Sequence, residues 1–487
     1  MSDRPGPFAR LESRLPVDAP WLSVPVGVVA AGAILAAAPL PTEAARMLAI
    51  TAFCIALWVG TPVPPWLTGV VGIGLIGVNF STELALFGFR SPATWLIVLG
   101  ILIGEATRQS GLAGLVERRV IEVMPAEAAT DPRAAYRYLL VAFSAIGAGF
   151  VFLVPSALVR VLILGPVLIS VGERFTQRRA RVGLFLGPLF VTYYAGAGVL
   201  TGSLGNIIIT GITESAAGLS IGWVEWLVWL GPVMTVLRTA VVVAIAYALY
   251  RPTTGDALAA DAGEVAAVTP NSSGSEEATD EGVVAGDERR MLAFLLVGVA
   301  IWATDAIHGL HPLYGALVVA VLVFLPRVGV VDLEAAGDAD FTILFFLGAI
   351  FAIAEGLQRT AFTDAAAGAI LSAVPADASL PVVLGAVSLV TAALTLVMEG
   401  LAVASVLTPV LVAFARDAGV PLLPVAMVEA VTLVTYFFPY QSAVLVALLG
   451  LDVVESREVI RMATACSLAT LLVLLPIQIA VFTVAFG

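Results

Sequence analysis

Four polar side chains stand in stretches of sequence that are otherwise almost entirely apolar. Ser156 and Arg160 lie in VPSALVRVLILGPVLIS at 154–170. Glu399 and Glu429 interrupt two later apolar runs. A charged side chain inside a membrane is costly and usually faces a cavity or an opposite charge. Arg160 is therefore predicted either to contact an anionic substrate or to pair with Glu399 or Glu429.

The two glutamates are candidates for ion coupling. Glu399 can bind a cation directly, carry a proton in place of sodium, or only cap the helix that starts at Leu401. Glu429 lies in the middle of MVEAVTLVTY and can relay a coupling ion through the membrane. Coupling and a purely structural role both stay open for these two carboxylates.

The elements that carry these side chains are predicted to be transmembrane helices. Of the 487 residues, 60% are hydrophobic and 12% are charged, whereas soluble domains carry about 25% charged residues. Apolar runs of about 18 residues or more recur along the chain, which favours helices over the short alternating strands of a barrel. We expect an all-α polytopic membrane protein with about eleven transmembrane helices and two re-entrant hairpins.

One apolar run, residues 138–172, is too long for a single span of about 20 residues. Pro155 and Ser156 interrupt its middle, and arginines flank both of its ends. Arginine marks the cytoplasmic side of a membrane, so both ends are predicted on one side and the run is predicted to be a hairpin. A second hairpin of similar length is predicted over 383–415, with its turn at 398–400.

Each predicted hairpin is followed by a long apolar run that contains poor helix formers, at 183–211 and at 422–450. Non-helical backbone at membrane depth is tolerated where it lines a cavity or is buried in protein. Half-helix N-termini attract anions, and freed carbonyl oxygens suit small cations. The two hairpin tips and the two broken spans are therefore predicted to enclose one site near the membrane midplane.

The residues of this site follow from the tips and the breaks. The candidate substrate-binding residues are Ser156, Arg160, Thr201, Ser203, Asn206, Glu399, Gln441 and Ser442. The candidate coupling-ion residues are Ser156, Gly202, Asn206, Glu399, Gly400 and Glu429. Cys54 and Cys466 lie in apolar runs and offer no metal framework. The coupling ion is therefore expected to be sodium or a proton, and no other cofactor is expected.

The two halves of the chain repeat. Residues 154–170 align with VMEGLAVASVLTPVLVA at 397–413, and VTYY at 191–194 aligns with VTYF at 434–437, both at an offset of 243 residues. Internal duplication is typical of transporters. Arginines are dense around the first hairpin and sparse around the second. The hairpins are therefore predicted to enter from opposite faces, as inverted repeats.

Four parts of the chain are predicted. An N-terminal tail and first span cover 1–44, the first repeat covers 45–250, and the second repeat covers 290–487. The acidic segment 251–289 is rich in Gly, Ser and Thr and is predicted to be a disordered cytoplasmic linker. With a cytoplasmic N-terminus, seventeen arginines fall in inside loops and four in outside loops. This distribution predicts that orientation in a cell (inner) membrane.

These motifs resemble the divalent anion/sodium symporter family, solute carrier family thirteen, of the ion transporter superfamily. Its members carry Ser-Asn-Thr at each hairpin tip, about ten residues before a Pro-aliphatic pair. Here the tips read Ser-Ala-Leu at 156–158 and Glu-Gly-Leu at 399–401. The breaks TGSLGN at 201–206 and FPYQS at 438–442 match the polar breaks of the family, and the likeness covers roughly 45–487. The segment GWVEWLVWLGPV resembles the part of the family that follows the first broken span.

The resemblance implies an elevator-type transporter, a homodimer, sodium coupling and a dicarboxylate substrate held by the tip motifs. Only Ser156 matches the first tip motif, and no residue matches the second. We therefore expect a secondary active transporter that moves a dicarboxylate or an inorganic oxyanion such as sulfate, with a sodium or a proton gradient. The alternatives are a cation/proton antiporter of the same superfamily and a non-transport membrane subunit. No motif favours an enzyme, an organic cofactor or a nucleic-acid partner.

Overall fold

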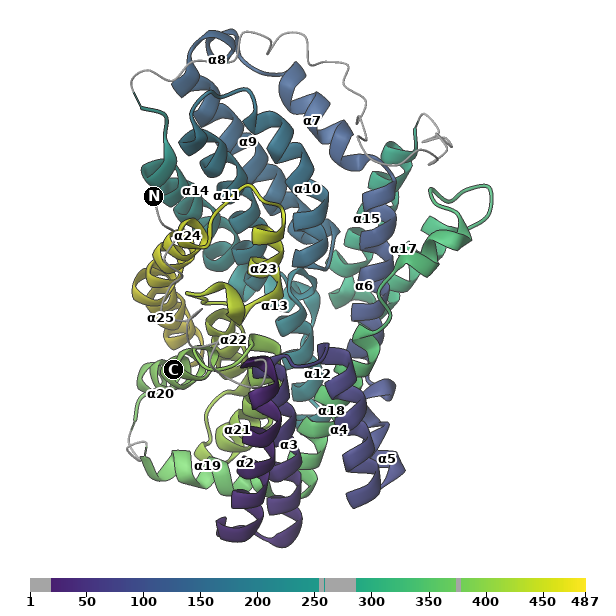
Figure 1. Ribbon diagram of the computed structural model, residues 1–487, viewed down its shortest axis with the longest axis vertical. Helices are drawn as coiled ribbons and strands as arrows, with labels where there is room; N and C mark the ends of the chain where they lie inside the picture. The colour runs from purple at the N-terminus through teal and green to yellow at the C-terminus, as the bar shows by residue number, and fades with distance from the viewer. Residues whose placement is uncertain (1–18, 254–257, 259–285, 374–377) are drawn as a thin grey trace.

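The computed structural model describes residues 19–253, 258, 286–373 and 378–487. Within these ranges the chain forms helices and no β-strand (Figure 1). The all-α class predicted from the sequence is thereby confirmed. The predicted N-terminal tail and most of the predicted linker at 251–289 lie outside the described residues.

The first described helices form an N-terminal group. They are η1 (Ala19–Leu22), α2 (Ser23–Ala37), α3 (Thr42–Gly60), α4 (Pro65–Asn79), α5 (Thr82–Ala85) and η2 (Phe87–Arg90). Helices α2 and α3 pack side by side along their lengths, and α4 packs against α18 from the second half of the chain (Figure 1). This group is therefore joined to the second half by direct helix packing.

The first half continues with twelve elements, two of them short 3₁₀ turns and one a π-helix. They are α6 (Pro92–Gln109), α7 (Leu112–Glu122), α8 (Ala126–Thr130), α9 (Pro132–Leu153), α10 (Ala157–Gly172), α11 (Arg178–Tyr194), η3 (Ala195–Gly198), η4 (Leu200–Gly202), α12 (Leu204–Ala217), α13 (Trp223–Leu230), the π-helix η5 (Gly231–Leu237) and α14 (Arg238–Tyr250).

The second half contains a similar series of elements. They are α15 (Asp287–Ala303), α16 (Asp305–His308), α17 (Leu313–Phe324), η7 (Leu333–Asp338), α18 (Ile343–Arg359), α19 (Phe362–Ala373), α20 (Leu380–Thr395), α21 (Gly400–Ala418), α22 (Leu422–Leu433), η8 (Pro439–Gln441), α23 (Ala443–Gly450), α24 (Ser456–Ala469), the π-helix η9 (Thr470–Leu474) and α25 (Leu475–Phe486).

The two halves repeat the same four units in the same order. Each has a helix pair with a sharp bend, 55° between α6 and α7 and 75° between α18 and α19. A helix pair with a short break follows, α9 and α10 or α20 and α21. Next come a span broken by a 3₁₀ turn and a long helix interrupted by a π-helix. In Figure 1, α9 and α10 lie in the upper half of the molecule and α20 and α21 in the lower half. The two broken helix pairs therefore reach the middle of the molecule from opposite ends.

The breaks arise where the sequence disfavours helix. Helix α9 ends at Leu153 and α10 begins at Ala157, so the break contains Pro155, whose ring removes a backbone donor. The break between α11 and α12 contains three glycines, Gly196, Gly198 and Gly202, and glycine weakens a helix interior by about 1 kcal/mol relative to alanine. In the second half, Pro439 falls in the break between α22 and α23.

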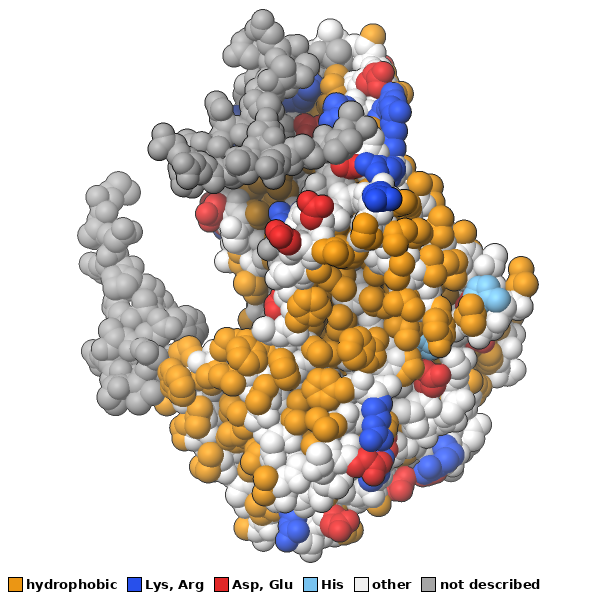
Figure 2. Space-filling model, turned by 90° about the vertical axis from the view of Figure 1, so that its right-hand side faces the viewer, with side chains coloured by type: hydrophobic (Ala, Val, Ile, Leu, Met, Phe, Trp, Pro, Cys, Tyr) orange, Lys and Arg blue, Asp and Glu red, His pale blue; other side chains and the backbone are white. Residues whose placement is uncertain are grey.

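The outer surface is that of a membrane protein. In the view of Figure 2, hydrophobic side chains form a broad band, and charged side chains lie mainly above and below it. Large apolar residues such as Val78, Leu472 and Val484 are 70–89% exposed, which water would disfavour and lipid does not. Six described helices are long and apolar enough to cross a membrane, up to eight if each bent pair is one span, and five shorter apolar helices accompany them. The expected number of about eleven spans stays a prediction.

Candidate functional site

Four half-helices begin at the breaks, and a predicted site residue stands at the N-cap position of each; in three of them its side chain accepts a hydrogen bond from the first turn. Ser156 precedes α10 and accepts a hydrogen bond from the Val159 amide at 3.4 Å. Glu399 precedes α21 and accepts one from the Leu401 amide at 2.8 Å. Ser203 and Ser442 are the N-cap residues of α12 and α23. Each break therefore leaves a helix N-terminus, with its partial positive charge, inside the protein.

Arg160 lies one turn into α10 and is completely buried. Its guanidinium donates to the carbonyl oxygens of Val154 at 2.5 Å, Thr192 at 2.8 Å and Gly202 at 2.7 Å. These carbonyls come from the end of α9, from α11 and from the break before α12. Arg160 thus joins the first hairpin tip to the first broken span.

Asn206 satisfies the neighbouring carbonyls of the same break. Its amide nitrogen donates to Gly196 at 3.0 Å, to Val199 at 2.9 Å and to Ala197 at 3.4 Å. The side-chain oxygen of Asn206, Oδ1, has no hydrogen-bond partner among the described residues. Thr201 accepts a hydrogen bond from the Trp223 indole at 3.0 Å. The first break is therefore held by side-chain donors that approach from several helices.

Two glycines, Gly196 and Gly400, allow the hairpin tips and the broken spans to approach each other closely. A Cβ on Gly196 would lie 2.5 Å from the Gly202 carbonyl oxygen and 3.2 Å from an Arg160 nitrogen. In the second half, a Cβ on Gly400 would lie 2.1 Å from the Tyr436 hydroxyl. A larger residue at either position would push the tip and the broken span apart.

The second break is organised by Gln441, which is fully buried. Its side-chain oxygen accepts from the amides of Phe437 at 2.8 Å and Phe438 at 2.7 Å. Its side-chain nitrogen donates to the carbonyl of Thr395, at the end of α20. Gln441 therefore connects the second tip to the second broken span, as Arg160 does in the first repeat.

Glu429 lies in α22 and is fully buried. One carboxylate oxygen accepts from the Thr408 hydroxyl of α21 at 2.9 Å, and the other has no partner among the described residues. Glu399 is partly buried and caps α21. Within the described ranges, neither carboxylate pairs with Arg160. The ion pair left open by the sequence is therefore not seen.

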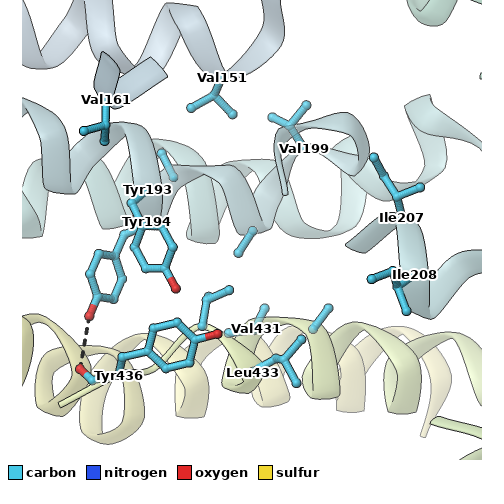
Figure 3. Close-up of a cluster of buried hydrophobic side chains, with 14 of the residues drawn as sticks. Val151, Val161, Tyr193, Tyr194, Val199, Ile207, Ile208, Val431, Leu433 and Tyr436 are labelled. Atoms are coloured by element: carbon cyan, nitrogen blue, oxygen red, sulfur yellow. Dashed lines mark hydrogen bonds between the residues drawn. The ribbon is translucent and has the colours of Figure 1, made fainter. Parts of the chain in front are cut away.

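The two breaks meet through a group of tyrosines. Tyr193 and Tyr194, at the end of α11, point toward Tyr436 in the second break (Figure 3). The ring centroids of Tyr193 and Tyr436 are 5.9 Å apart. The Tyr194 and Ser467 hydroxyls lie 2.9 Å apart, and Ser467 donates to the Tyr436 carbonyl at 2.6 Å. Helix α12 also packs against α21, so the helix that follows the first break contacts the helix that follows the second tip.

Arg238 is a second completely buried arginine, at the start of α14. It donates to the Tyr194 carbonyl at 3.2 Å, and its guanidinium carbon lies 4.6 Å from the Tyr194 ring centroid. Its Nε and Nη2 have no hydrogen-bond partner among the described residues. Arg238 and the tyrosines were not among the predicted site residues. The available signal was an arginine inside the apolar run at 222–250.

The fold and this site define a helical membrane protein of the transporter class. The chain is similar in fold to the YdaH transporter of Alcanivorax borkumensis, whose crystal structure shows an unusual topology. The likeness has a TM-score of 0.55 and covers 90% of this chain and 98% of that one, at 16% sequence identity. At this identity the likeness concerns the fold alone.

The family follows from the sequence comparison. A model of the sodium:sulfate symporter transmembrane region matches residues 21–484. The chain therefore belongs to the sodium:sulfate symporter family, which confirms the resemblance seen in the tip and break motifs.

The relatives are distant. A membrane protein of Cupriavidus necator is 26% identical over an alignment of 345 positions, and the match covers 65% of this chain and 63% of that protein. The L-tartrate/succinate antiporter of Escherichia coli K12 is 22% identical over 335 residues, 62% of this chain and 63% of the relative. The match thus spans slightly less than two thirds of the length of these relatives.

Proposed function

We propose that the protein is a secondary active transporter that moves a small anion across the membrane with a cation gradient. The observation that carries the proposal is the pairing of two helix breaks in each repeat, with Ser156, Ser203, Glu399 and Ser442 at the N-termini of the half-helices. Buried half-helix N-termini attract an anion. The family and the Escherichia coli antiporter support an anionic substrate.

The substrate class is a dicarboxylate or an inorganic oxyanion such as sulfate. Succinate and L-tartrate are suggested by the name of the Escherichia coli relative, and sulfate by that of the family. We propose that hydroxyl and amide groups at the tips and breaks contact the anion. These groups belong to Ser156, Thr201, Ser203, Asn206, Gln441 and Ser442.

The coupling ion is sodium or a proton. Glu399, partly buried at the second tip, and Glu429, fully buried in α22, suit either ion, since a carboxylate can bind a cation or take up a proton. Gly400 places backbone groups at the second tip, where freed carbonyl oxygens suit sodium, whereas the carbonyl of Gly202 in the first break already accepts a hydrogen bond from Arg160. We propose transport by an elevator-type movement of the hairpins and broken spans, in a homodimer in the inner membrane with a cytoplasmic N-terminus.

Ligand-dependent melting of the purified protein tests this function. Sulfate, succinate and L-tartrate are each added as sodium and as choline salts, at one ionic strength. A substrate stabilises the folded state by RT ln(1 + [L]/Kd), so one of the anions should raise the melting temperature and the others should not. If no anion has an effect in either salt and the protein instead exchanges cations for protons, the cation/proton antiporter is the better description.

A further inference from the structure

The guanidinium of Arg160 lies where three backbone carbonyl oxygens converge. The carbonyls of Val154, Thr192 and Gly202 belong to three separate segments, and all lie within 2.8 Å of the guanidinium nitrogens. Carbonyl oxygens freed by an unwound membrane helix are ligands for sodium. The guanidinium of Arg160 thus occupies the place that a bound monovalent cation would take among these carbonyl oxygens.

The positive charge of Arg160 has no acidic partner among the described residues. The residue is completely buried and forms no ion pair within the described ranges. Hydrogen bonding alone does not require this charge, because the neutral amide of Asn206 satisfies three carbonyls of the same break. A buried unpaired charge is more costly than a buried amide. The property that Arg160 adds to the break is therefore its charge.

The second repeat lacks this feature. At the offset of 243 residues, Ser156 corresponds to Glu399 and Arg160 corresponds to Val403, which is buried in α21. The second repeat instead carries the buried carboxylate of Glu429. The first repeat thus has a buried positive charge at a position that is apolar in the second repeat, and the second repeat has a buried carboxylate at Glu429 where the first repeat has Leu186.

We propose that Arg160 replaces a mobile cation in the first repeat. The coupling ion then binds in the second repeat alone, and the first break keeps its positive charge, available to the anion, in every step of the cycle. This inference rests on the proposed anion transport and specifies its coupling. Removing the guanidinium should leave three carbonyl oxygens that accept a soluble cation.

The test uses the purified full-length protein and its Arg160→Ala variant. Melting temperatures are measured with millimolar sodium, guanidinium or choline chloride at constant ionic strength. The variant should melt below the wild type, and sodium or guanidinium, but not choline, should raise its melting temperature by about 2 °C with saturation. The wild type should show no such rise from guanidinium.

Arg238→Ala is the matched control. Arg238 is also completely buried, but it donates to one carbonyl instead of three. Its variant should be destabilised without recovery by either cation. Equal responses of the two variants, or no response of Arg160→Ala to any cation, would overturn the proposal.

Two further variants keep the test informative if Arg160→Ala does not fold. Arg160→Lys keeps the charge and should remain insensitive to sodium. Arg160→Gln keeps donors without the charge and should gain sodium-dependent stabilisation. If Arg160→Gln instead behaves as the wild type in melting and in anion uptake, the charge has no role and the proposal fails.

The melting experiment separates this inference from the proposed function, because it needs no transported substrate. In uptake assays, a wild type that transports an anion while no Arg160 variant gains sodium dependence contradicts the inference alone. A wild type that neither binds nor transports an anion contradicts the proposed function.

Discussion

The hydroxyl groups of Tyr194 and Ser467 lie 2.9 Å apart and join the two halves of the chain at their breaks. Tyr194 ends α11, and Ser467 lies in α24, 273 residues further along the chain. Ser467 donates in turn to the Tyr436 carbonyl of the second break. If the first break moves relative to α24, the hydrogen bond between Tyr194 and Ser467 must therefore be lost; otherwise α24 must move together with the first break.

Replacing Ser467 by alanine should destabilise the protein. The change removes hydrogen bonds of 2.9 Å and 2.6 Å and leaves the Tyr194 hydroxyl, among the described residues, with contacts of 3.5 Å to the carbonyls of Tyr436 and Ala463. A buried polar group left poorly satisfied costs about 1–3 kcal/mol. The melting temperature should fall below that of a Thr470→Val control, because the Thr470 hydroxyl donates to the Cys466 carbonyl four residues earlier and, within the described residues, makes no bond to either break. Equal melting temperatures would show that the contact does not stabilise the fold.

Gly400→Ala should also destabilise the protein, because the new Cβ would lie 2.1 Å from the Tyr436 hydroxyl. Overpacking of this kind costs about 1–3 kcal/mol. Adding Tyr436→Phe removes the clashing oxygen and should restore part of the lost stability. Gly385→Ala in α20 is the control, since nothing lies within 4 Å of its Cβ position. A double variant no more stable than Gly400→Ala would contradict this explanation.

The capping and coupling roles of Glu399 can be separated with two substitutions. Glu399→Ala removes the cap on α21 and should cost about 1 kcal/mol of stability. Glu399→Ser keeps a capping oxygen, so its melting temperature should stay near that of the wild type. If Glu399 carries the coupling ion, anion uptake by Glu399→Ser should no longer follow the imposed cation gradient. Normal gradient-driven uptake by this variant would leave Glu399 as a cap only.

Glu429→Gln should uncouple transport more than it destabilises the protein. The amide keeps an acceptor for the Thr408 hydroxyl, which lies 2.9 Å from the carboxylate, but it cannot exchange a proton or balance a cation. Net uptake driven by a gradient should fall at least tenfold, whereas exchange of labelled for unlabelled anion should persist. Glu355→Gln, which removes an ion pair with Arg359 at the end of α18, should leave both activities intact.

The burial of His311 should make the folded protein less stable on acidification. This residue lies before α17, and burial lowers its pKa from 6.5, while Glu214 at 3.7 Å opposes that shift. As the pH falls below about 6.5 the unfolded chain takes up this proton before the folded protein does, so folding stability decreases until the pH passes the folded pKa. His311→Gln should flatten this part of the stability profile. His308→Gln, at an exposed histidine, is the control. If His308→Gln changes the pH profile of stability and His311→Gln does not, the loss of stability does not arise from His311.

Local sequence signals were sufficient for the fold class and for the residues at the tips. Long apolar runs predict transmembrane helices, and the described residues are helical and expose apolar side chains. Pro155 and Ser156 mark a point where a helix must stop, and α10 begins directly after them. These features depend on residue type and on near neighbours, which the sequence displays directly.

The partners of Arg160 were not predictable in the same way. Its acceptors are backbone carbonyls of Val154, Thr192 and Gly202, and any residue type can supply a carbonyl oxygen. A charged partner such as Glu429 was the natural expectation from residue types alone. The contact between Tyr194 and Ser467 spans 273 residues and depends on how the two repeats pack. The π-helices η5 and η9 were not predicted, although Pro232 lies in the first and Pro476 lies two residues after the second.

Uptake of labelled anion into proteoliposomes is the most direct test of the central claim. The purified protein is reconstituted, and sulfate, succinate and L-tartrate are presented with an inward sodium gradient, an inward proton gradient or no gradient. A cation-coupled anion transporter should show concentrative uptake of one anion class under one of the two gradients, and this uptake should be lost when the gradient is collapsed by an ionophore. Uptake of no anion under either gradient, by protein shown to be folded after reconstitution, would contradict the assignment as a cation-coupled anion transporter.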